Sequence, residues 1–157
     1  MNDLIIKNVF AVLPDRVTDT AISVLVRDGR ITEIDTNTTD SSLPVVDGNG
    51  GYLFAGFIDC HVHGGGGADF MDATVEAFET VTVAHLKHGT TMLIPTSMTA
   101  TLDELEAFVK TYLQFINTER KGSKTLGLHF EGPYLSGAGA KSRGAQRGDL
   151  LRFPDMD

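Results

Sequence analysis

Hydrophobic and polar residues alternate over the first third of the chain, as they do in β-strands. Short apolar runs cover residues 4–13, 22–26, 30–34 and 45–47. The second and third runs flank Asp28-Gly29. Asp-Gly between two alternating runs is typical of a tight hairpin turn, because that turn needs positive φ. We therefore expect short strands here, two of them joined in a hairpin.

Two stretches interrupt these strands. Residues 36–42 are polar and predict a loop, and Asn37-Thr38-Thr39 within it matches a glycosylation sequon by chance. Residues 48–51 read Gly-Asn-Gly-Gly and predict a boundary between two parts of the chain. We expect one domain to occupy residues 1–53 and a second region to occupy residues 54–157.

Strand and helix patterns alternate in the second region. The helix that follows Thr101 has a capping box with Glu104, and its apolar residues recur at helical spacing. Strand starts recur roughly every 35 residues, the size of one strand–helix unit of a parallel sheet. Such units predict an α/β fold, either a doubly wound sheet or a closed eight-stranded barrel. The expected elements are a strand at about 53–63, a helix at 74–87 ended by Gly89, a strand at 91–95, the capped helix, and a strand at 125–131.

The first of these strands contains two histidines separated by one residue. Because side chains alternate along a strand, Asp59, His61 and His63 should share one face. Polar groups that face inward are costly unless they are paired, and a divalent metal is the simplest partner for two imidazoles. A pair of hydrogen-bonded histidines without a metal is the alternative. The opposite face, which should meet a helix layer, has Ile58, Cys60 and Val62.

The last strand ends in a second candidate ligand. Glu131 follows Phe130 at the carboxyl end of that strand, where active sites of barrels lie. Its carboxylate can join the two histidines on one metal or bridge two metals, and a solvated loop carboxylate is the alternative. His129 should lie deeper, as a packed residue or one behind the ligands.

Other reactive residues have simpler interpretations. His85 and His88 lie on a predicted helix and read as structural or surface residues, and Cys60 reads as a packed, inert thiol. The glycines of residues 64–67 predict a close backbone approach beside the histidines. They do not predict a phosphate loop, because no Gly-Lys-Ser/Thr follows them.

The loop at residues 136–146 is rich in glycine and alanine and contains Lys141 and Arg143. It follows Glu131 along the chain. It either closes over a substrate or is a mobile surface loop.

Composition excludes several classes of protein. The 157 residues are 41% hydrophobic and 22% charged, as in an ordinary globular protein, with a net charge of −8 that disfavours nucleic acid as a partner. A single cysteine allows no disulfide within the chain and is typical of a reducing compartment. We find no signal peptide and no run of about 18 apolar residues. We therefore expect a cytoplasmic protein without a membrane span.

Five segments together resemble one known family. They lie at residues 55–67, 89–91, 95–97, 127–135 and 141–146. The first resembles the entry strand of the amidohydrolase superfamily. The set is similar to the N-acetylglucosamine-6-phosphate deacetylase family within it, and the segment Gly-Leu-His-Phe-Glu-Gly-Pro-Tyr-Leu is the most specific part. The resemblance extends over essentially the whole chain.

The resemblance implies a particular architecture and a particular site. It implies the first three strand–helix units of a metal-dependent (β/α)8 TIM-like barrel, at residues 54–157, after part of a small β-sandwich domain at residues 1–53. Glu131 corresponds to the metal-binding carboxylate of the family, and His61 and His63 would complete the site. Ala145 and Gln146 match positions that contact the sugar. The implied cofactor is a divalent metal, zinc first, with one or two ions in each site.

The resemblance also implies that much of the family's active site is elsewhere. A barrel of this kind needs about 250 residues, and fewer than half of that number follow residue 53. Two further metal-binding histidines, the proton-transfer aspartate and most phosphate-binding residues correspond to positions beyond Asp157. We therefore expect no deacetylase activity from the 157 residues alone, and a homo-oligomer for a full-length protein.

The activity that the resemblance implies is hydrolysis of the acetamide of N-acetylglucosamine 6-phosphate to glucosamine 6-phosphate and acetate. Three alternatives remain. One is a deacetylase for a related substrate such as N-acetylgalactosamine 6-phosphate. Another is a non-catalytic metal-binding fragment that needs a partner chain. A doubly wound nucleotide-binding fold is the most distant, because no glycine fingerprint opens a helix after the first strand.

Overall fold

A computed structural model of the chain describes residues 3–34, 42–136 and 143–154. These residues form two compact units, Met1–Ala55 and Gly56–Asp157. Most of the loop predicted at 36–42, its glycosylation motif, and Lys141 lie outside the described residues.

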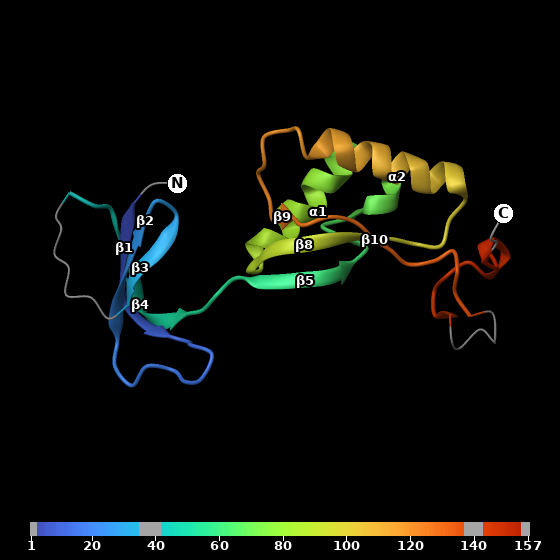
Figure 1. Cartoon of the computed structure of the whole chain (residues 1–157). Helices are drawn as coiled ribbons and strands as arrows, with labels where there is room; N and C mark the ends of the chain where they lie inside the picture. The colour runs from blue at the N-terminus through green and yellow to red at the C-terminus, as the bar shows by residue number, and fades with distance from the viewer. Residues whose placement is uncertain (1–2, 35–41, 137–142, 155–157) are drawn as a thin grey trace. The chain divides into compact units, whose positions relative to one another are not determined.

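The first unit is built on one four-stranded sheet, whose described strands lie in the order β3-β2-β1-β4 (Figure 1). Strand β1 pairs antiparallel with β2 and parallel with β4, and β2 pairs antiparallel with β3. Asp28 and Gly29, at φ 49° and 71°, join β2 to β3, so the predicted hairpin is confirmed. The strands are β1 (Leu4–Ala11), β2 (Ile22–Arg27), β3 (Arg30–Ile34) and β4 (Val45–Leu53).

The glycine-rich segment at 48–51 does not form the boundary between the units, and that prediction was wrong. Strand β4 runs through it with a shift in register, and Asn49 and Gly50 have φ of 50° and 73°. The carboxylate of Asp47 accepts hydrogen bonds from the backbone N–H of Asn49, at 2.8 Å, and from the side chain of Asn8, at 3.1 Å. These bonds satisfy polar groups at the irregularity, so pairing with β1 resumes beyond it.

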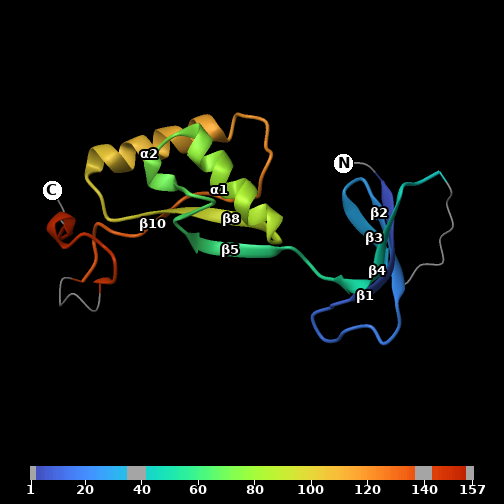
Figure 2. The same cartoon turned by 180° about the vertical axis from the view of Figure 1, so that it is seen from behind.

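The second unit combines a parallel sheet with two helices. Strand β8 pairs in parallel with β5 along one side, and also with the short strands β9 and β10. Figure 1 and Figure 2 show both helices on the same face of β5 and β8. The elements in chain order are β5 (Phe57–Val62), β6 (Gly64–Gly65), β7 (Ala68–Asp69), η1 (Phe70–Asp72), α1 (Val75–Lys87), β8 (Thr90–Ser97), α2 (Leu102–Phe115), β9 (Lys124–Thr125), β10 (His129–Phe130) and η2 (Gly148–Leu150).

Each of the two helices begins after a threonine N-cap. The hydroxyl of Thr74 accepts a hydrogen bond from the N–H of Ala77 at the start of α1. Thr101 and Glu104 form the predicted capping box at the start of α2. The inward faces of both helices meet the sheet in a core rich in aromatic residues. Its buried members are Val62, Phe70, Phe78, Val81, Leu93, Phe108 and Phe115.

The third predicted strand is not continuous. Strands β9 and β10 contact β8 near its beginning and at its end, with Gly127 at φ 155° between them. The described part of the chain contains two complete strand–helix units, β5–α1 and β8–α2, rather than the three expected. Because parallel strands alternate with helices, the α/β fold is confirmed. The closed barrel stays a prediction.

The helix layer covers less of β5 than the alternation predicts. Val62 is buried in the core as expected, but Cys60 and Ile58 are exposed. The prediction of a packed Cys60 thiol was wrong. The reason is that β5 lies at the edge of the described sheet, while the core forms around its last residue and around β8.

Within the described residues, no helix is both long and apolar enough to cross a membrane.

Candidate metal centre

His61, His63 and Glu131 converge at the carboxyl ends of the parallel strands. His61 lies near the end of β5, His63 directly follows that strand, and Glu131 directly follows β10. Strands β5 and β10 both run parallel to β8, so their carboxyl ends point the same way. This arrangement brings residues 70 positions apart into contact.

The ligand atoms of the three side chains are close together. Oε2 of Glu131 lies 2.9 Å from Nε2 of His61 and 3.1 Å from Nε2 of His63. The two Nε2 atoms are 3.2 Å apart. The side chains of His61, His63 and Glu131 are 48%, 30% and 27% exposed, so a small ligand can reach them.

The backbone of β8 orients His63. Nδ1 of His63 lies 3.2 Å from the carbonyl oxygen of Thr96, which can only accept a hydrogen bond. Nδ1 must therefore carry the proton in the neutral ring, which leaves the lone pair of Nε2 directed at His61 and Glu131. The hydroxyl of Thr96 accepts a hydrogen bond from the N–H of Val62 at 3.1 Å, so the same residue also ties β5 to β8.

Two further polar side chains lie beside the cluster. The carboxylate of Asp59 accepts a hydrogen bond from the backbone N–H of His61 at 3.0 Å. The ring of His129 meets that of His61 edge-on, at 4.9 Å between centroids. His129 is exposed, so the expectation that it lies deeper than Glu131 was wrong. The contact between His129 and His61 agrees with the expectation that His129 lies next to the candidate ligands.

The donor set and its spacing fit a divalent metal ion. Two imidazole nitrogens and a carboxylate oxygen are ligands that zinc takes in proteins. Two bonds of about 2.0–2.1 Å at a tetrahedral angle separate their ligand atoms by about 3.3 Å. The observed separations of 2.9 to 3.2 Å are close to that value. The three residues can therefore hold one ion with little rearrangement.

A glycine hairpin follows His63 directly. Strands β6 and β7 pair across Gly66 and Gly67, which have φ of 65° and 88°. Nε2 of His85, on α1, lies 3.1 Å from the carbonyl oxygen of Gly64. A Cβ at Gly65 would lie 2.9 Å from that nitrogen, so a larger residue there would have to displace the His85 side chain. The glycines thus have the predicted role, and His85 has a structural one.

Ala145 and Gln146 differ in their surroundings. Ala145 is exposed, whereas Gln146 is only 5% exposed. Oε1 of Gln146 accepts a hydrogen bond from the N–H of Thr99 at 2.6 Å, and its Nε2 lies 3.5 Å from Sδ of Met98. The structure therefore places the amide of Gln146 against the segment that follows β8. The sugar contacts that the resemblance implies for Ala145 and Gln146 stay predictions.

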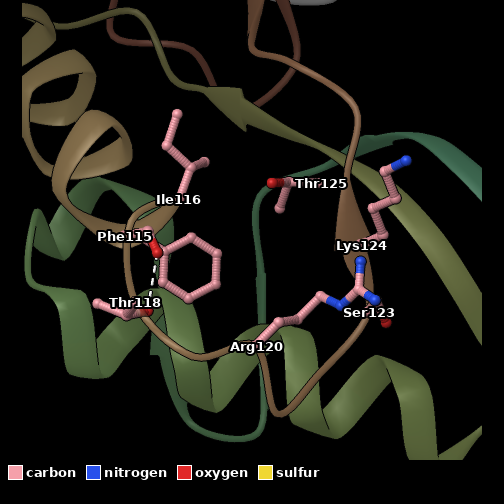
Figure 3. A pocket seen from close by; sticks show the side chains of 7 residues that line it. All are labelled: Phe115, Ile116, Thr118, Arg120, Ser123, Lys124 and Thr125. Atoms are coloured by element: carbon pink, nitrogen blue, oxygen red, sulfur yellow. Dashed lines mark hydrogen bonds between the residues drawn. The ribbon is translucent and has the colours of Figure 1, made fainter. Parts of the chain in front are cut away.

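A separate pocket of about 210 Å³ lies between the end of α2 and β9 (Figure 3). Strand β9 pairs with Met92 and Leu93, whereas the histidine–glutamate cluster lies near the end of β8. The described lining contains no histidine, cysteine or carboxylate. Its lining residues are Phe115, Ile116, Thr118, Arg120, Ser123, Lys124 and Thr125.

Sequence reasoning assigned no role to Thr96 and Thr99. Thr96 orients His63, and Thr99 contacts both Gln146 and the backbone of Glu131. The available signal was a polar Thr-Ser-Met-Thr segment at the carboxyl end of a buried strand. A backbone atom takes part in each of these contacts, and a residue pattern does not specify such contacts.

The sequence matches known proteins over nearly its full length. Residues 52–152 match the model of the amidohydrolase family. An N-acetylglucosamine-6-phosphate deacetylase of Lysinibacillus sphaericus is 32% identical over 154 residues, which are 98% of this chain and 39% of that protein. An N-acetylgalactosamine-6-phosphate deacetylase of a Shewanella species is 39% identical over 87 residues, which are 55% of this chain and 22% of that protein.

A solved structure is similar to the whole described fold. The crystal structure of N-acetylglucosamine-6-phosphate deacetylase from Pasteurella multocida superposes with a TM-score of 0.82 at 28% identity. The superposition covers 98% of this chain and 40% of that one. The chain thus spans about two fifths of the length of the two N-acetylglucosamine-6-phosphate deacetylases, from Lysinibacillus sphaericus and Pasteurella multocida.

Proposed function

The chain belongs to the amidohydrolase family, and from that premise we propose that residues 54–157 are the first part of a metal-dependent (β/α)8 barrel. Residues 1–53 are then part of a small β-sandwich domain that accompanies it. The likeness to the Pasteurella multocida deacetylase over 98% of this chain supports both assignments. Both sides of β8 are already paired in parallel, as in a barrel wall.

The proposed reaction of the whole protein is the hydrolysis of N-acetylglucosamine 6-phosphate in the cytoplasm. Water cleaves the amide bond and gives glucosamine 6-phosphate and acetate. The observation behind this proposal is the convergence of His61, His63 and Glu131 in a chain that is 32% identical to a deacetylase of that name.

The three converging residues would hold the metal in this proposal. A bound divalent ion, zinc first, supplies the Lewis acidity that activates water and polarises an amide carbonyl. The carbonyl of Thr96 keeps the Nε2 lone pair of His63 available, and Asp59 fixes the backbone of His61. Glu131 brings a negative charge to the site. A site with this carboxylate should bind a cation more tightly than two neutral imidazoles alone would.

Other parts of the site are proposed from the family resemblance. Ala145 and Gln146 would lie beside the sugar of the amino sugar phosphate. The proton-transfer aspartate and two further histidine ligands correspond to positions beyond Asp157. We therefore propose that the 157 residues bind metal but do not release acetate alone, and that the full-length protein is a homo-oligomer.

Zinc titration of the chain by calorimetry tests the metal centre directly. We expect one zinc site, which Glu131→Gln weakens because the substitution removes the negative charge. Glu76→Gln is the matched control, since Glu76 is an exposed carboxylate in the first turn of α1. Equal zinc affinity in the wild type and Glu131→Gln would refute the assignment.

A chimaera tests the reaction. The chain is joined to the part of the Lysinibacillus sphaericus deacetylase that it does not match, and acetate release from N-acetylglucosamine 6-phosphate is measured. We expect metal-dependent release that Glu131→Ala abolishes. Undiminished release by Glu131→Ala would contradict the proposed role of this carboxylate.

The epimeric substrate is a second candidate. It is favoured by the 39% identity to an N-acetylgalactosamine-6-phosphate deacetylase over 87 residues. Acetate release from the two epimers, measured side by side with the same chimaera, decides between them.

A metal-binding fragment that acts only with a partner chain is the third candidate. It is favoured by apolar side chains exposed on the described strands of the second unit, among them Phe57, Ile58 and Phe130, which are 56%, 57% and 45% exposed. Acetate release that appears only when a second polypeptide is added would support this candidate.

A further inference from the structure

Gln146 is buried and uses its side chain within the protein. It is 5% exposed, and its Oε1 accepts the backbone N–H of Thr99 across 47 positions of sequence. At 2.6 Å this is a short hydrogen bond, and Nε2 lies 3.5 Å from Sδ of Met98. The Oε1 atom thus satisfies a buried backbone donor, which gives the side chain a structural partner.

Thr99 in turn contacts the backbone of the proposed carboxylate ligand. Its hydroxyl donates a hydrogen bond to the carbonyl oxygen of Glu131 at 3.5 Å, and Thr99 is only 2% exposed. Gly132, the next residue, has φ of 86° and lies so close that an added Cβ would overlap the hydroxyl of Thr99. The backbone at Glu131 and Gly132 is therefore held against Thr99 by packing as well as by a hydrogen bond.

We propose that Gln146 is a positioning residue for the metal centre, acting through Thr99 on Glu131. The side chain of Gln146 fixes the backbone of Thr99, and the hydroxyl of Thr99 fixes the backbone from which the Glu131 carboxylate extends. This inference rests on the proposed function, because it takes Glu131 as a metal ligand. It goes beyond a sugar contact for Gln146, since it predicts an effect on metal binding when no sugar is present.

Two substitutions of Gln146 distinguish the role of its hydrogen-bond acceptor from the role of the volume that its side chain fills. Leucine has a similar size but cannot accept the N–H of Thr99, so Gln146→Leu leaves a buried donor without a partner. Gln146→Glu keeps an oxygen at the same reach. The chain offers a matched control, because its only other glutamine, Gln114, lies exposed on α2.

The experiment is a zinc titration of the 157-residue chain and its variants by competition with a chelator. Partners behind metal ligands typically change metal affinity by roughly 10- to 100-fold. We expect Gln146→Leu to weaken zinc binding by about tenfold, Gln146→Glu to restore most of the affinity, and Gln114→Leu to have no effect. Circular dichroism and urea denaturation of each variant separate a loss of affinity from a loss of folding.

The path through Thr99 has its own test. Thr99→Val removes the hydroxyl and keeps the N–H, so it breaks the contact with Glu131 alone. We expect Thr99→Val to weaken zinc binding, and Gln146→Leu to add little to that loss, because residues that act in sequence are not additive. Amide hydrogen exchange at Thr99 should be faster in Gln146→Leu and unchanged in Gln114→Leu.

The outcomes separate this inference from the proposed function. If the wild type binds zinc and both Gln146→Leu and Thr99→Val bind it equally well, the positioning role is refuted and the metal centre stands. If the two losses add fully, Gln146 does not act through Thr99. If the folded wild type binds no zinc, the metal centre itself is refuted, and this inference falls with it.

Discussion

The two compact units use β-strands in different ways. In Met1–Ala55, three of the four strands form antiparallel pairs, so their carboxyl ends lie at opposite edges of the sheet. In Gly56–Asp157, every strand that pairs with β8 is parallel to it. Parallel pairing gathers the carboxyl ends of different strands at one edge, where polar side chains meet.

The distribution of histidine follows this difference. All five histidines of the chain lie in the second unit, and three of them, His61, His63 and His129, lie within β5 and β10 or directly after β5. The first unit has none. Its polar side chains at irregular positions instead support turns, as Asp47 does beside Asn49. Polar side chains on or beside strands thus support the backbone in the first unit and form a candidate metal centre in the second.

The largest expected effect is confined to the metal centre. His61→Ala removes a proposed ligand, and we expect zinc affinity to fall by more than the roughly 100-fold upper range for partners behind ligands. Asp47→Ala, in the first unit, should leave zinc affinity unchanged although it disturbs β4. Competition titration measures both. A comparable loss of zinc affinity in Asp47→Ala would show that zinc binding is not confined to the second unit.

Core substitutions should destabilise the units separately. Phe78 and Ile5 are both fully buried, in the second and first units. We expect Phe78→Ala to lower the free energy of unfolding of the second unit by about 3–5 kcal/mol, and Ile5→Val to lower that of the first by about 0.5–1.5 kcal/mol. Hydrogen exchange read by peptide mass spectrometry follows each unit in urea. Loss of protection in both units with either variant would argue against separate units.

A smaller effect should mark the hairpin of the first unit. Gly29 has φ of 71°, where a side chain costs roughly 1–2 kcal/mol. Gly29→Ala should therefore destabilise the hairpin of β2 and β3 by about that amount and leave zinc affinity as it is. Peptides from 22–34 should exchange faster, while those from 75–87 should not. Equal acceleration in both sets would contradict this prediction.

The smallest effect should come from the start of α2. Thr101→Ala removes the N-cap hydroxyl and should destabilise the helix by about 1 kcal/mol. Thermal unfolding monitored by circular dichroism measures this change. Thr118→Ala is a suitable comparison for the thermal unfolding of Thr101→Ala. It removes a hydroxyl that donates a hydrogen bond to the carbonyl of Phe115 at the other end of α2. No change in Thr101→Ala would mean that the capping box contributes nothing measurable.

The capping box also predicts a dependence on pH. Hydrogen bonds from the backbone and then the side chain of Thr101 lower the pKa of Glu104 below its ordinary value. A carboxyl group with a lowered pKa stabilises the folded state above its unfolded pKa of about 4.3, and this contribution is lost as the pH falls through the lower folded pKa. The stability difference between the wild type and Glu104→Ala should thus shrink below about pH 4. A difference that is constant from pH 7 to pH 3 would contradict it.

Local patterns in the sequence predicted the local structure well. Asp28-Gly29 predicted the hairpin, and Thr101 with Glu104 predicted the beginning of α2, because turns and caps depend on residues within a few positions of one another. Alternation along β5 also placed His61 and His63 on a common side. Their role as metal ligands, with Glu131, stays a prediction.

Patterns that depend on distant contacts were interpreted less well. The glycines at 48–51 resembled a boundary, but β1 pairs on both sides of them. The alternation placed Cys60 under a helix layer, but Cys60 is exposed in the structure. The third strand, which was expected to be continuous, is broken at Gly127. In each case a neighbour far away in sequence decides whether a strand continues or a side chain is covered.

The sequence by itself determined the α/β rhythm, the caps and turns, and the residue types able to bind a metal, because these follow from short-range backbone preferences and side-chain chemistry. Only the tertiary structure decided that Thr96 orients His63 and that Gln146 reaches Thr99 behind Glu131. These contacts join segments 32 to 47 residues apart through backbone atoms. Every residue except proline has the same backbone N–H and C=O groups, so their partners are set by how the strands are brought together.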